Sequence, residues 1–138
     1  GAASITSSIA LDKVVKAGLS YSMSPVWDEE LQNQARKINQ VLVPGVFSPS
    51  EINKAISYGH KLLKFFPAST LGLNYLQQLH GPIDRMPFII AAGGIIAKDI
   101  KSWLDTGHDA VALGRCLIKG EKIDPELHKW LQQNTVNL

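Results

Sequence analysis

The sequence predicts an α/β domain in which strand–helix units repeat and the strands pair in parallel. Short apolar runs alternate with amphipathic helical patterns, and successive runs begin roughly 20 to 25 residues apart. Helix-starting residues and terminal glycines fall between these runs at the expected places. The 138 residues suit a single domain over 1–138, long enough to bury a hydrophobic core.

Six segments have the apolar character of buried strands, and each gap between them holds one predicted helix. In chain order the segments are Ala2–Ile5, Leu19–Ser24, Gln40–Pro44, Lys61–Phe66, Pro87–Ala92 and Asp109–Leu113. Two architectures share this rhythm: an open doubly wound sheet, and part of a (β/α)8 TIM barrel. Spacing alone does not separate them, and eight units of about 17 residues do not fit in this length.

The predicted helices have well-marked ends. Ser48-Pro49-Ser50-Glu51 combines an N-cap serine, an early proline and a glutamate that completes a capping box. Asp28 and Asp124 are predicted to cap the helices that follow them. Helix-terminating glycines precede three of the predicted strands, at Gly18, Gly59 and Gly107.

Lys64 lies in the middle of the otherwise apolar strand 61–66. Side chains alternate along a strand, so Leu62, Lys64 and Phe66 are expected to share one face. Burial lowers the pKa of an ammonium group, and a neutral amine attacks carbonyl carbons to form imines. Lys64 is therefore a candidate catalytic nucleophile. A lysine that extends to solvent or pairs with an acid remains the alternative interpretation.

A phosphate site is predicted where the strand 87–92 runs into Gly93-Gly94. Glycines let backbone N–H groups approach an anion, and the N-terminus of a following helix favours negative charge. Arg115 follows the last strand and could add a charged contact, or could be an ordinary surface arginine. Pro44 and Gly45 end an earlier strand and could shape the mouth of a pocket, although a simple turn is an equal alternative.

Composition argues against several classes of function. The net charge of +2 and the lack of a basic run argue against nucleic-acid binding, and no apolar stretch is long enough to cross a bilayer. The single cysteine, Cys116, excludes a disulfide framework and is expected to be a small buried residue. None of the four histidines has metal-ligand spacing, so all are expected to be structural or surface residues: His60, His80, His108 and His128. A cytoplasmic protein is expected.

Taken in order, these segments resemble the 2-keto-3-deoxy-6-phosphogluconate (KDPG) and 4-hydroxy-2-oxoglutarate (KHG) aldolases. Val43-Pro44-Gly45-Val46-Phe47-Ser48-Pro49-Ser50-Glu51 is similar to the family's Pro-Gly-Val-x-Thr-Pro-Ser-Glu stretch. Lys64-Phe65-Phe66-Pro67-Ala68 resembles the Lys-Leu-Phe-Pro-Ala signature, and Ala92-Gly93-Gly94-Ile95 resembles the Thr-Gly-Gly-Ile phosphate loop. The resemblance runs from Gly1 to about Leu117. It implies a TIM barrel of which this chain covers strands 3 to 8.

The resemblance also implies a class I aldolase. Lys64 would form a Schiff base with a 2-keto acid, and the products would be pyruvate plus glyceraldehyde 3-phosphate or glyoxylate. Ser4 stands at the position that contacts the pyruvate carboxylate, Pro44 lines the mouth, and Phe66 packs against the intermediate. Gly93, Gly94 and Arg115 would bind the substrate phosphate. No cofactor is expected, and the assembly would be a homotrimer.

The resemblance has departures that bear on function. Ala92 replaces the usual threonine, and Arg115 stands where a phosphate-contacting serine is usual. The general acid/base glutamate and an arginine belong to family strands that would precede Gly1. Two alternatives therefore stay open: a phosphate-binding (β/α) module without turnover, and another phosphate-binding barrel enzyme. The second does not predict the lysine signature.

Overall fold

A computed structural model describes residues 1–79, 81, 83, 85–120 and 122–134. Strands and helices alternate along most of the chain, as the sequence predicts. The strands are β1 Tyr21–Met23, β2 Val41–Val43, β3 Gly45–Val46, β4 Leu62–Phe65, β5 Phe88–Ala92, β6 Ala110–Ala112, β7 Ile118–Lys119 and β8 Lys122–Ile123. The helices are α1 Ser8–Lys16, α2 Glu29–Lys37, α3 Pro49–Ser57, α4 Ala68–Leu71, α5 Tyr75–Leu79, α6 Ile100–Asp105 and α7 Pro125–Asn134, with 3-10 turns η1 Ala97–Asp99 and η2 Arg115–Leu117.

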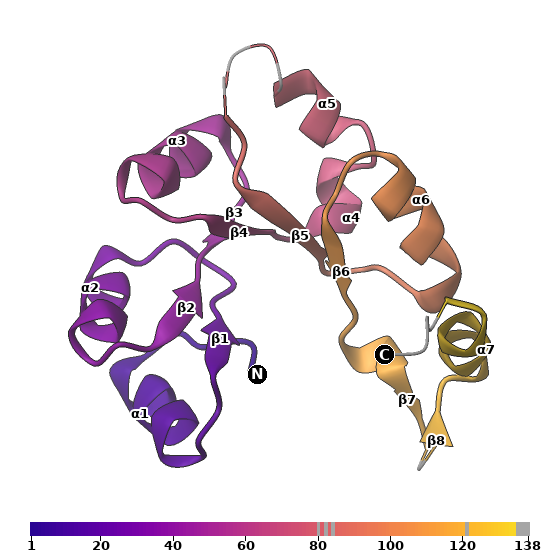
Figure 1. The fold of residues 1–138 in the computed structure, drawn as a ribbon, viewed down its shortest axis with the longest axis horizontal. Helices are drawn as coiled ribbons and strands as arrows, with labels where there is room; N and C mark the ends of the chain where they lie inside the picture. Colours follow the sequence, from indigo (N-terminus) through magenta and orange to yellow (C-terminus); the bar gives the residue numbers. More distant parts are fainter. Residues whose placement is uncertain (80, 82, 84, 121, 135–138) are drawn as a thin grey trace.

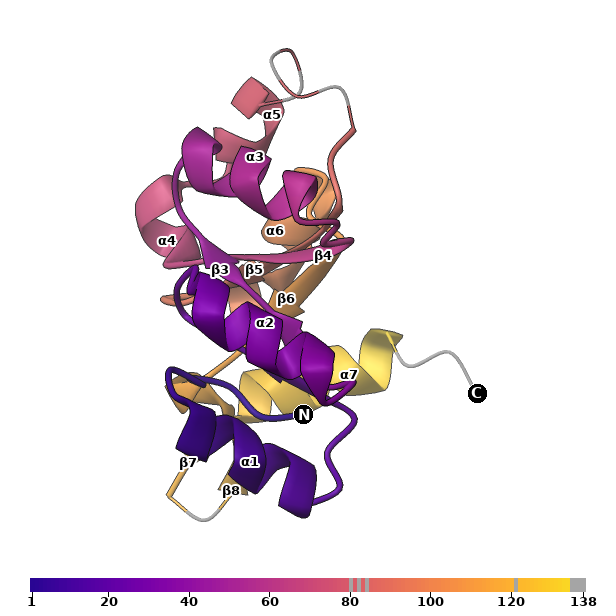
Figure 2. The ribbon, with the colours of Figure 1, turned by 90° about the vertical axis from the view of Figure 1, so that its left-hand side faces the viewer.

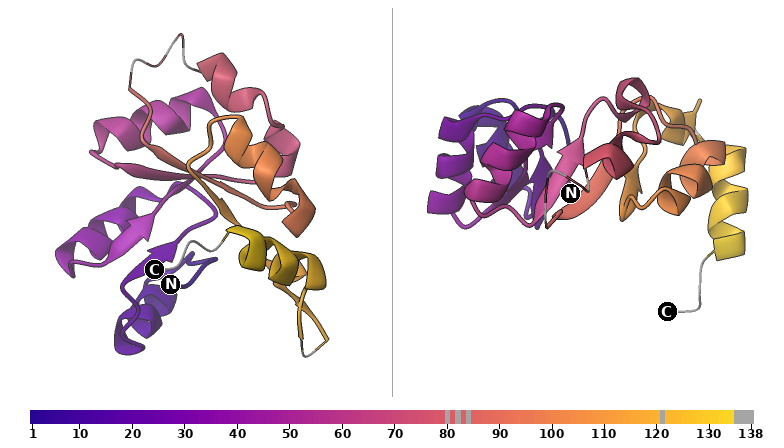
Figure 3. Two further views of the ribbon diagram at one scale, coloured as in Figure 1. Left: turned by 45° about the vertical axis from the view of Figure 1, so that its right-hand side comes forward. Right: turned by 90° about the horizontal axis from the view of Figure 1, so that it is seen from above.

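The parallel strands follow one another in chain order around an open arc (Figure 1). β1 pairs with β2, while β3, β4, β5 and β6 form a second parallel sheet. The helices lie on the outer side of the arc; Figure 2 shows α1, α2 and α3 stacked along it, and Figure 3 shows the succession continuing to α7. Within the described residues the strands do not close into a ring. This is the arrangement of an incomplete TIM barrel.

A break at Pro44 divides one predicted strand in two. Proline has no N–H, so it interrupts the ladder of hydrogen bonds. Residues before the break pair with β1, where Val43 lies opposite Met23, and residues after it pair with β4, where Gly45 lies opposite Lys64. Gly45 also allows a close backbone approach, because a Cβ there would lie 2.3 Å from the carbonyl carbon of Pro25.

The main core lies between the second sheet and its covering helices. Leu63 and Phe65 of β4 are fully buried in a cluster with residues of β3, β5, α3 and α5. Since side chains alternate along a strand, Lys64 is directed to the other face, inside the arc. The same alternation leaves large apolar side chains exposed on that inner face, including Tyr21, Val41 and Leu62.

The predicted helix caps are confirmed. Ser48 and Glu51 form the complete capping box of α3, and the Asp28 carboxylate accepts a hydrogen bond from the backbone N–H of Leu31 at 3.0 Å. Asp124 accepts from the N–H groups of Glu126 and Leu127 at the start of α7. The terminating glycines adopt the left-handed conformation that glycine favours, at Gly18, Gly59 and Gly107.

Two segments differ from their predictions. The predicted strand Ala2–Ile5 is reduced to a single bridge between Ala2 and Ser22, because Ser4 adopts a left-handed conformation with φ of 63°. Ile5 nevertheless donates to the carbonyl of Met23 at 3.1 Å. The short antiparallel pair β7–β8 was not predicted, since two-residue strands carry too little pattern to recognise.

The histidines are not grouped in the described part of the chain. His108 is buried, His60 is half-buried and His128 is exposed, while His80 lies outside the described residues. No cluster of three or more potential metal ligands occurs among the residues described. No helix in the described ranges is long and apolar enough to cross a membrane.

Candidate active site

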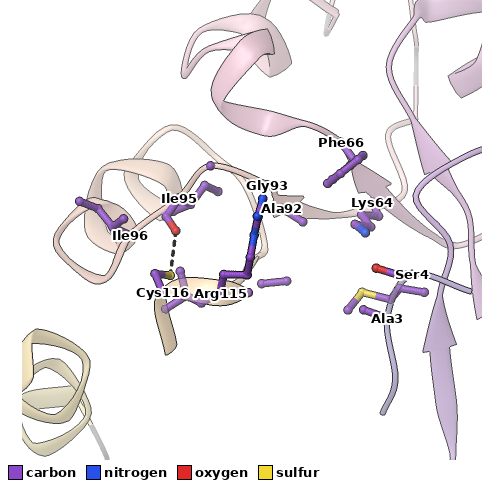
Figure 4. A pocket seen from close by; sticks show the side chains of 15 residues that line it. Ala3, Ser4, Lys64, Phe66, Ala92, Gly93, Ile95, Ile96, Arg115 and Cys116 are labelled. Carbon is purple, nitrogen blue, oxygen red and sulfur yellow. Dashed lines mark hydrogen bonds between the residues drawn. The ribbon is translucent and has the colours of Figure 1, made fainter. Parts of the chain in front are cut away.

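A pocket of about 480 Å³ opens at the carboxyl ends of the parallel strands. It is lined by residues at or just beyond the ends of β1, β4, β5 and β6, together with the segment before α1. This is the face on which enzymes of the TIM-barrel class place their active sites. Six of the seven residues singled out from the sequence line it: Ser4, Lys64, Phe66, Gly93, Gly94 and Arg115 (Figure 4).

Lys64 is the buried amine of this pocket. Its residue surface is 4% exposed, and its Nζ lies 4.4 Å from the centroid of the Phe66 ring. Among the described residues no carboxylate lies within ion-pair distance of that nitrogen. Burial lowers the pKa of Lys64, because the apolar surroundings disfavour the charged form. The alternative of a lysine paired with an acid is therefore absent from the described structure.

The backbone holds Lys64 rigidly from both sides. Its N–H donates to the carbonyl of Pro44 at 2.9 Å, and it lies opposite Ile90 in the parallel pairing of β4 with β5. Leu63 and Phe65, its sequence neighbours, are anchored in the core. The amine is consequently directed into the pocket by a central strand, and its position varies only through its own side-chain rotamers.

Ser4 brings a hydroxyl to the same pocket from a strained backbone. Its left-handed conformation is uncommon for a residue with a Cβ, and such conformations gather at functional sites. Figure 4 shows the Ser4 hydroxyl and the Lys64 amine directed toward the same space. The pocket therefore presents a hydrogen-bonding hydroxyl beside its amine.

The glycine pair and Arg115 form another side of the pocket. Gly93 and Gly94 both have positive φ, at 93° and 75°. A Cβ on Gly93 would lie 2.8 Å from the Phe66 ring, so only glycine lets this loop approach the aromatic side chain. Arg115 is exposed and is directed toward Gly93 (Figure 4). Backbone N–H groups and a guanidinium together suit an anionic group such as a phosphate.

Pro44 is the one of the seven that is not among the described residues lining the pocket. Its side chain is fully buried, and its carbonyl accepts the Lys64 N–H. Its contribution is therefore to support the strand that carries Lys64.

Several lining residues were not singled out as site residues from the sequence. Met23 and Cys116 both line the pocket, and the Cys116 thiol donates to the carbonyl of Ile95 at 3.2 Å. Cys116 is half-buried rather than a buried core residue, because η2 places it at the pocket wall. No Asp, Glu or His is among the described residues that line the pocket.

A buried lysine without an acidic partner in the described structure, at the carboxyl ends of parallel strands and beside a diglycine loop, places this pocket in the β/α-barrel class of proteins. The family model described as KDPG and KHG aldolase matches residues 1–133. The chain belongs to this aldolase family, whose members are lyases. It is 33% identical over 105 residues to 2-dehydro-3-deoxy-phosphogluconate aldolase of Dickeya dadantii (strain 3937), which covers 75% of this chain and 49% of the relative. The chain thus spans about half the length of that relative.

Two solved structures show the same fold. KDPG aldolase of Zymomonas mobilis ZM4, solved with 3-phosphoglycerate, superposes with a TM-score of 0.81 at 22% identity, covering 96% of this chain and 64% of that one. KDPG aldolase of Legionella pneumophila, with pyruvate captured at low pH as a covalent carbinolamine, has a TM-score of 0.73 at 29% identity. This match covers 80% of the present chain and 54% of the Legionella pneumophila chain.

Proposed function

We propose that Lys64 forms a Schiff base with a 2-keto acid in a class I aldolase reaction. The observation that carries this proposal is the unpaired amine of Lys64, buried in a pocket on a central strand. Lowering the pKa of an amine increases its neutral, nucleophilic fraction at a given pH, whereas an ordinary lysine is almost fully charged near neutral pH. The carbinolamine of the Legionella pneumophila relative is the first covalent intermediate of the same chemistry.

In the proposed reaction the lone pair of Nζ attacks the C2 carbonyl carbon of the substrate. The carbinolamine loses water to give an iminium, which withdraws electrons from the neighbouring carbon. The C3–C4 bond then breaks, its electron pair moves toward the iminium to give an enamine, and the C4 oxygen loses its proton as the aldehyde forms. Protonation of the enamine at C3 and hydrolysis of the iminium release pyruvate and restore Lys64.

We further propose that the substrate is of the KDPG or KHG type, with glyceraldehyde 3-phosphate or glyoxylate as the aldehyde. Ser4 would donate to the keto-acid carboxylate, and Phe66 would pack against the bound carbon chain. Gly93, Gly94 and Arg115 would bind a terminal phosphate through two backbone N–H groups and a guanidinium. A homotrimer and a cytoplasmic location, both expected from the resemblance, stay predictions; light scattering in solution tests the first.

A second candidate function is phosphate binding without turnover. It is favoured by the absence of Asp, Glu and His from the described pocket lining, since bond cleavage requires proton transfer at C4 and C3. Imine formation needs fewer groups, so pyruvate can bind covalently in a site that does not cleave the full substrate. The two functions therefore differ in whether Lys64 reacts with pyruvate.

Borohydride reduction in the presence of pyruvate tests the proposal. We expect a stable pyruvate adduct by intact mass, mapped to the peptide that contains Lys64. The Lys64→Ala variant should lose it, and Lys98→Ala, which removes an exposed lysine, should keep it. A folded wild-type chain that gives no adduct, or an adduct that persists in Lys64→Ala, would contradict the assignment. Phosphate binding without an adduct would favour the second candidate.

A further inference from the structure

A second pocket, of about 260 Å³, lies at the opposite end of the strands from Lys64. It is bounded by residues of α2, by β2 with the residue before it, and by the segment from Gly59 to Leu62 at the start of β4. In Figure 1 this region is where α2 lies against β2. The proposed aldolase reaction uses none of these residues.

One residue that lines this pocket, Gln32, has a buried amide nitrogen without a partner in the described structure. Gln32 is 1% exposed, and its Nε2 has no hydrogen-bond partner in the described structure. It occupies the inner face of α2 with Leu31 and Ala35, where an apolar side chain would be expected. A buried N–H donor without a partner is unfavourable, so its retention here points to a ligand that accepts from it.

His60 provides a second unsatisfied group. Its Nε2 is buried and has no partner among the described residues. The ring is held between Trp27, which it meets edge-on at 5.6 Å between centroids, and Tyr58, which is stacked on it at 6.3 Å. Burial lowers the pKa of His60, and the charge of Arg36 lowers it further. The neutral imidazole can donate from Nε2 when its tautomer places the proton there.

The mouth of the pocket is positively charged. Arg36 and Lys61 both line it and are exposed, whereas no Asp or Glu is among its described lining residues. Arg36 is fixed in place, because it donates to the carbonyl of Tyr58 and lies over the Tyr58 ring, 4.6 Å from its centroid. A guanidinium has five N–H groups, so this contact leaves donors for a ligand. The nearby Glu29 carboxylate is paired with Lys54 at 2.8 Å.

We propose that this pocket, defined by Gln32, Arg36, His60 and Lys61, binds a small oxyanion of the phosphate or carboxylate type. In this proposal small rotations of the Gln32 and His60 side chains bring their buried N–H groups to the oxygen atoms, and the two cations balance the charge. Since the site lies at the amino ends of the strands, away from Lys64, its occupant is a second ligand and not the keto acid. It ties α2 to the starts of β2 and β4.

The test is an NMR titration of the isotope-labelled 138-residue chain with inorganic phosphate and, separately, with malonate. We expect saturable shifts of the His60 ring, the Gln32 side-chain amide and the Trp27 indole N–H signals. Tighter binding of phosphate than of malonate would identify a tetrahedral ligand, and the reverse order a carboxylate.

Two variants make the test specific. Gln32→Leu removes the amide at similar volume. Arg36→Gln removes an exposed guanidinium together with its contact to Tyr58, so it reports even if the buried change disturbs folding. Each is expected to weaken binding roughly tenfold, while the Lys64 pyruvate adduct, if formed by the wild type, should persist. Shifts that never saturate mean that the pocket holds only water. An affinity that stays at the wild-type value in both variants means that the anion binds elsewhere, and either result overturns the proposal.

Discussion

The two ends of the parallel strands both bury a nitrogen without a partner, but the two nitrogens differ in kind. At the carboxyl end, Lys64 is ionisable, and burial lowers the pKa of its amine, which favours the neutral form. At the amino end, the Gln32 amide does not titrate, so burial leaves only an unsatisfied donor. The same unfavourable burial therefore alters the acid–base chemistry of the group in one pocket and leaves only an unsatisfied hydrogen-bond donor in the other.

The largest expected change in the free energy of unfolding comes from replacing a glycine by alanine, compared at the carboxyl and amino ends of the strands. Gly93→Ala combines a positive φ with a Cβ 2.8 Å from the Phe66 ring and 3.1 Å from Pro67 Cα. It should lower the free energy of unfolding by about 3 kcal/mol and displace Phe66. Gly59→Ala, with a φ of 83° and no atom within 4 Å, should cost only about 1 kcal/mol. Urea denaturation measures both, and equal costs would contradict the close contact at Gly93.

Replacing Lys64 by methionine should stabilise the chain by about 2 kcal/mol at neutral pH. Methionine fills similar space and removes the cost of burying an unpaired ammonium group. The same variant abolishes the pyruvate adduct, so it separates stability from reactivity. Thermal denaturation beside the exposed Lys98→Met control measures the gain; a destabilised Lys64→Met chain would mean that the amine has a stabilising partner.

The gain from Lys64→Met should depend on pH in one direction. The folded pKa of Lys64 lies below the ordinary value of 10.5, so the unfolded chain binds the extra proton between the two values. Wild-type stability therefore rises with pH through this interval, and the gap between wild type and variant narrows until about pH 10.5. Chemical denaturation across this range, with the two chains compared at each pH, measures the gap. A constant gap would show that Lys64 is not titrating differently in the folded state.

The smallest expected effect is at the amino end. Gln32→Leu should raise the free energy of unfolding by about 1 kcal/mol in a buffer free of phosphate and carboxylates, because it removes a buried donor without a partner. Adding phosphate should then stabilise the wild type more than the variant, which reduces or reverses the difference. Denaturation with and without phosphate measures this, and an unchanged difference would separate Gln32 from anion binding.

Local signals in the sequence account for most of the fold. The capping box at Ser48, the cap at Asp28 and the glycine at Gly59 lie where local chemistry requires them, and each was recognised from neighbouring residues. Lys64 was found for a similar reason, since a lysine inside an apolar strand conflicts with its surroundings. That Lys64 has no acidic partner in the described residues could be learned only from the structure, because ion pairs form between segments distant in sequence.

The features that were missed depend on tertiary contacts. The left-handed conformation of Ser4 has no signature in a run of small residues, and the burial of the Pro44 side chain cannot be read from a strand-ending motif. Gln32 offered a weak signal, as a polar residue beside Leu31 and Ala35 on the inner face of α2. Only the packing of α2 against β2 and β4 turns it into part of a pocket.

The break at Pro44 has a geometric consequence for the whole arc. The segment from Val41 to Val46 pairs with β1 through Val41–Val43 and with β4 through Gly45–Val46. β1 and β4 are therefore displaced relative to each other along this segment. Such a stagger between adjacent strands is the shear that tilts the strands of a barrel and sets its diameter. The register of individual strand pairs therefore sets the curvature of the arc, and a closed ring is not needed for it.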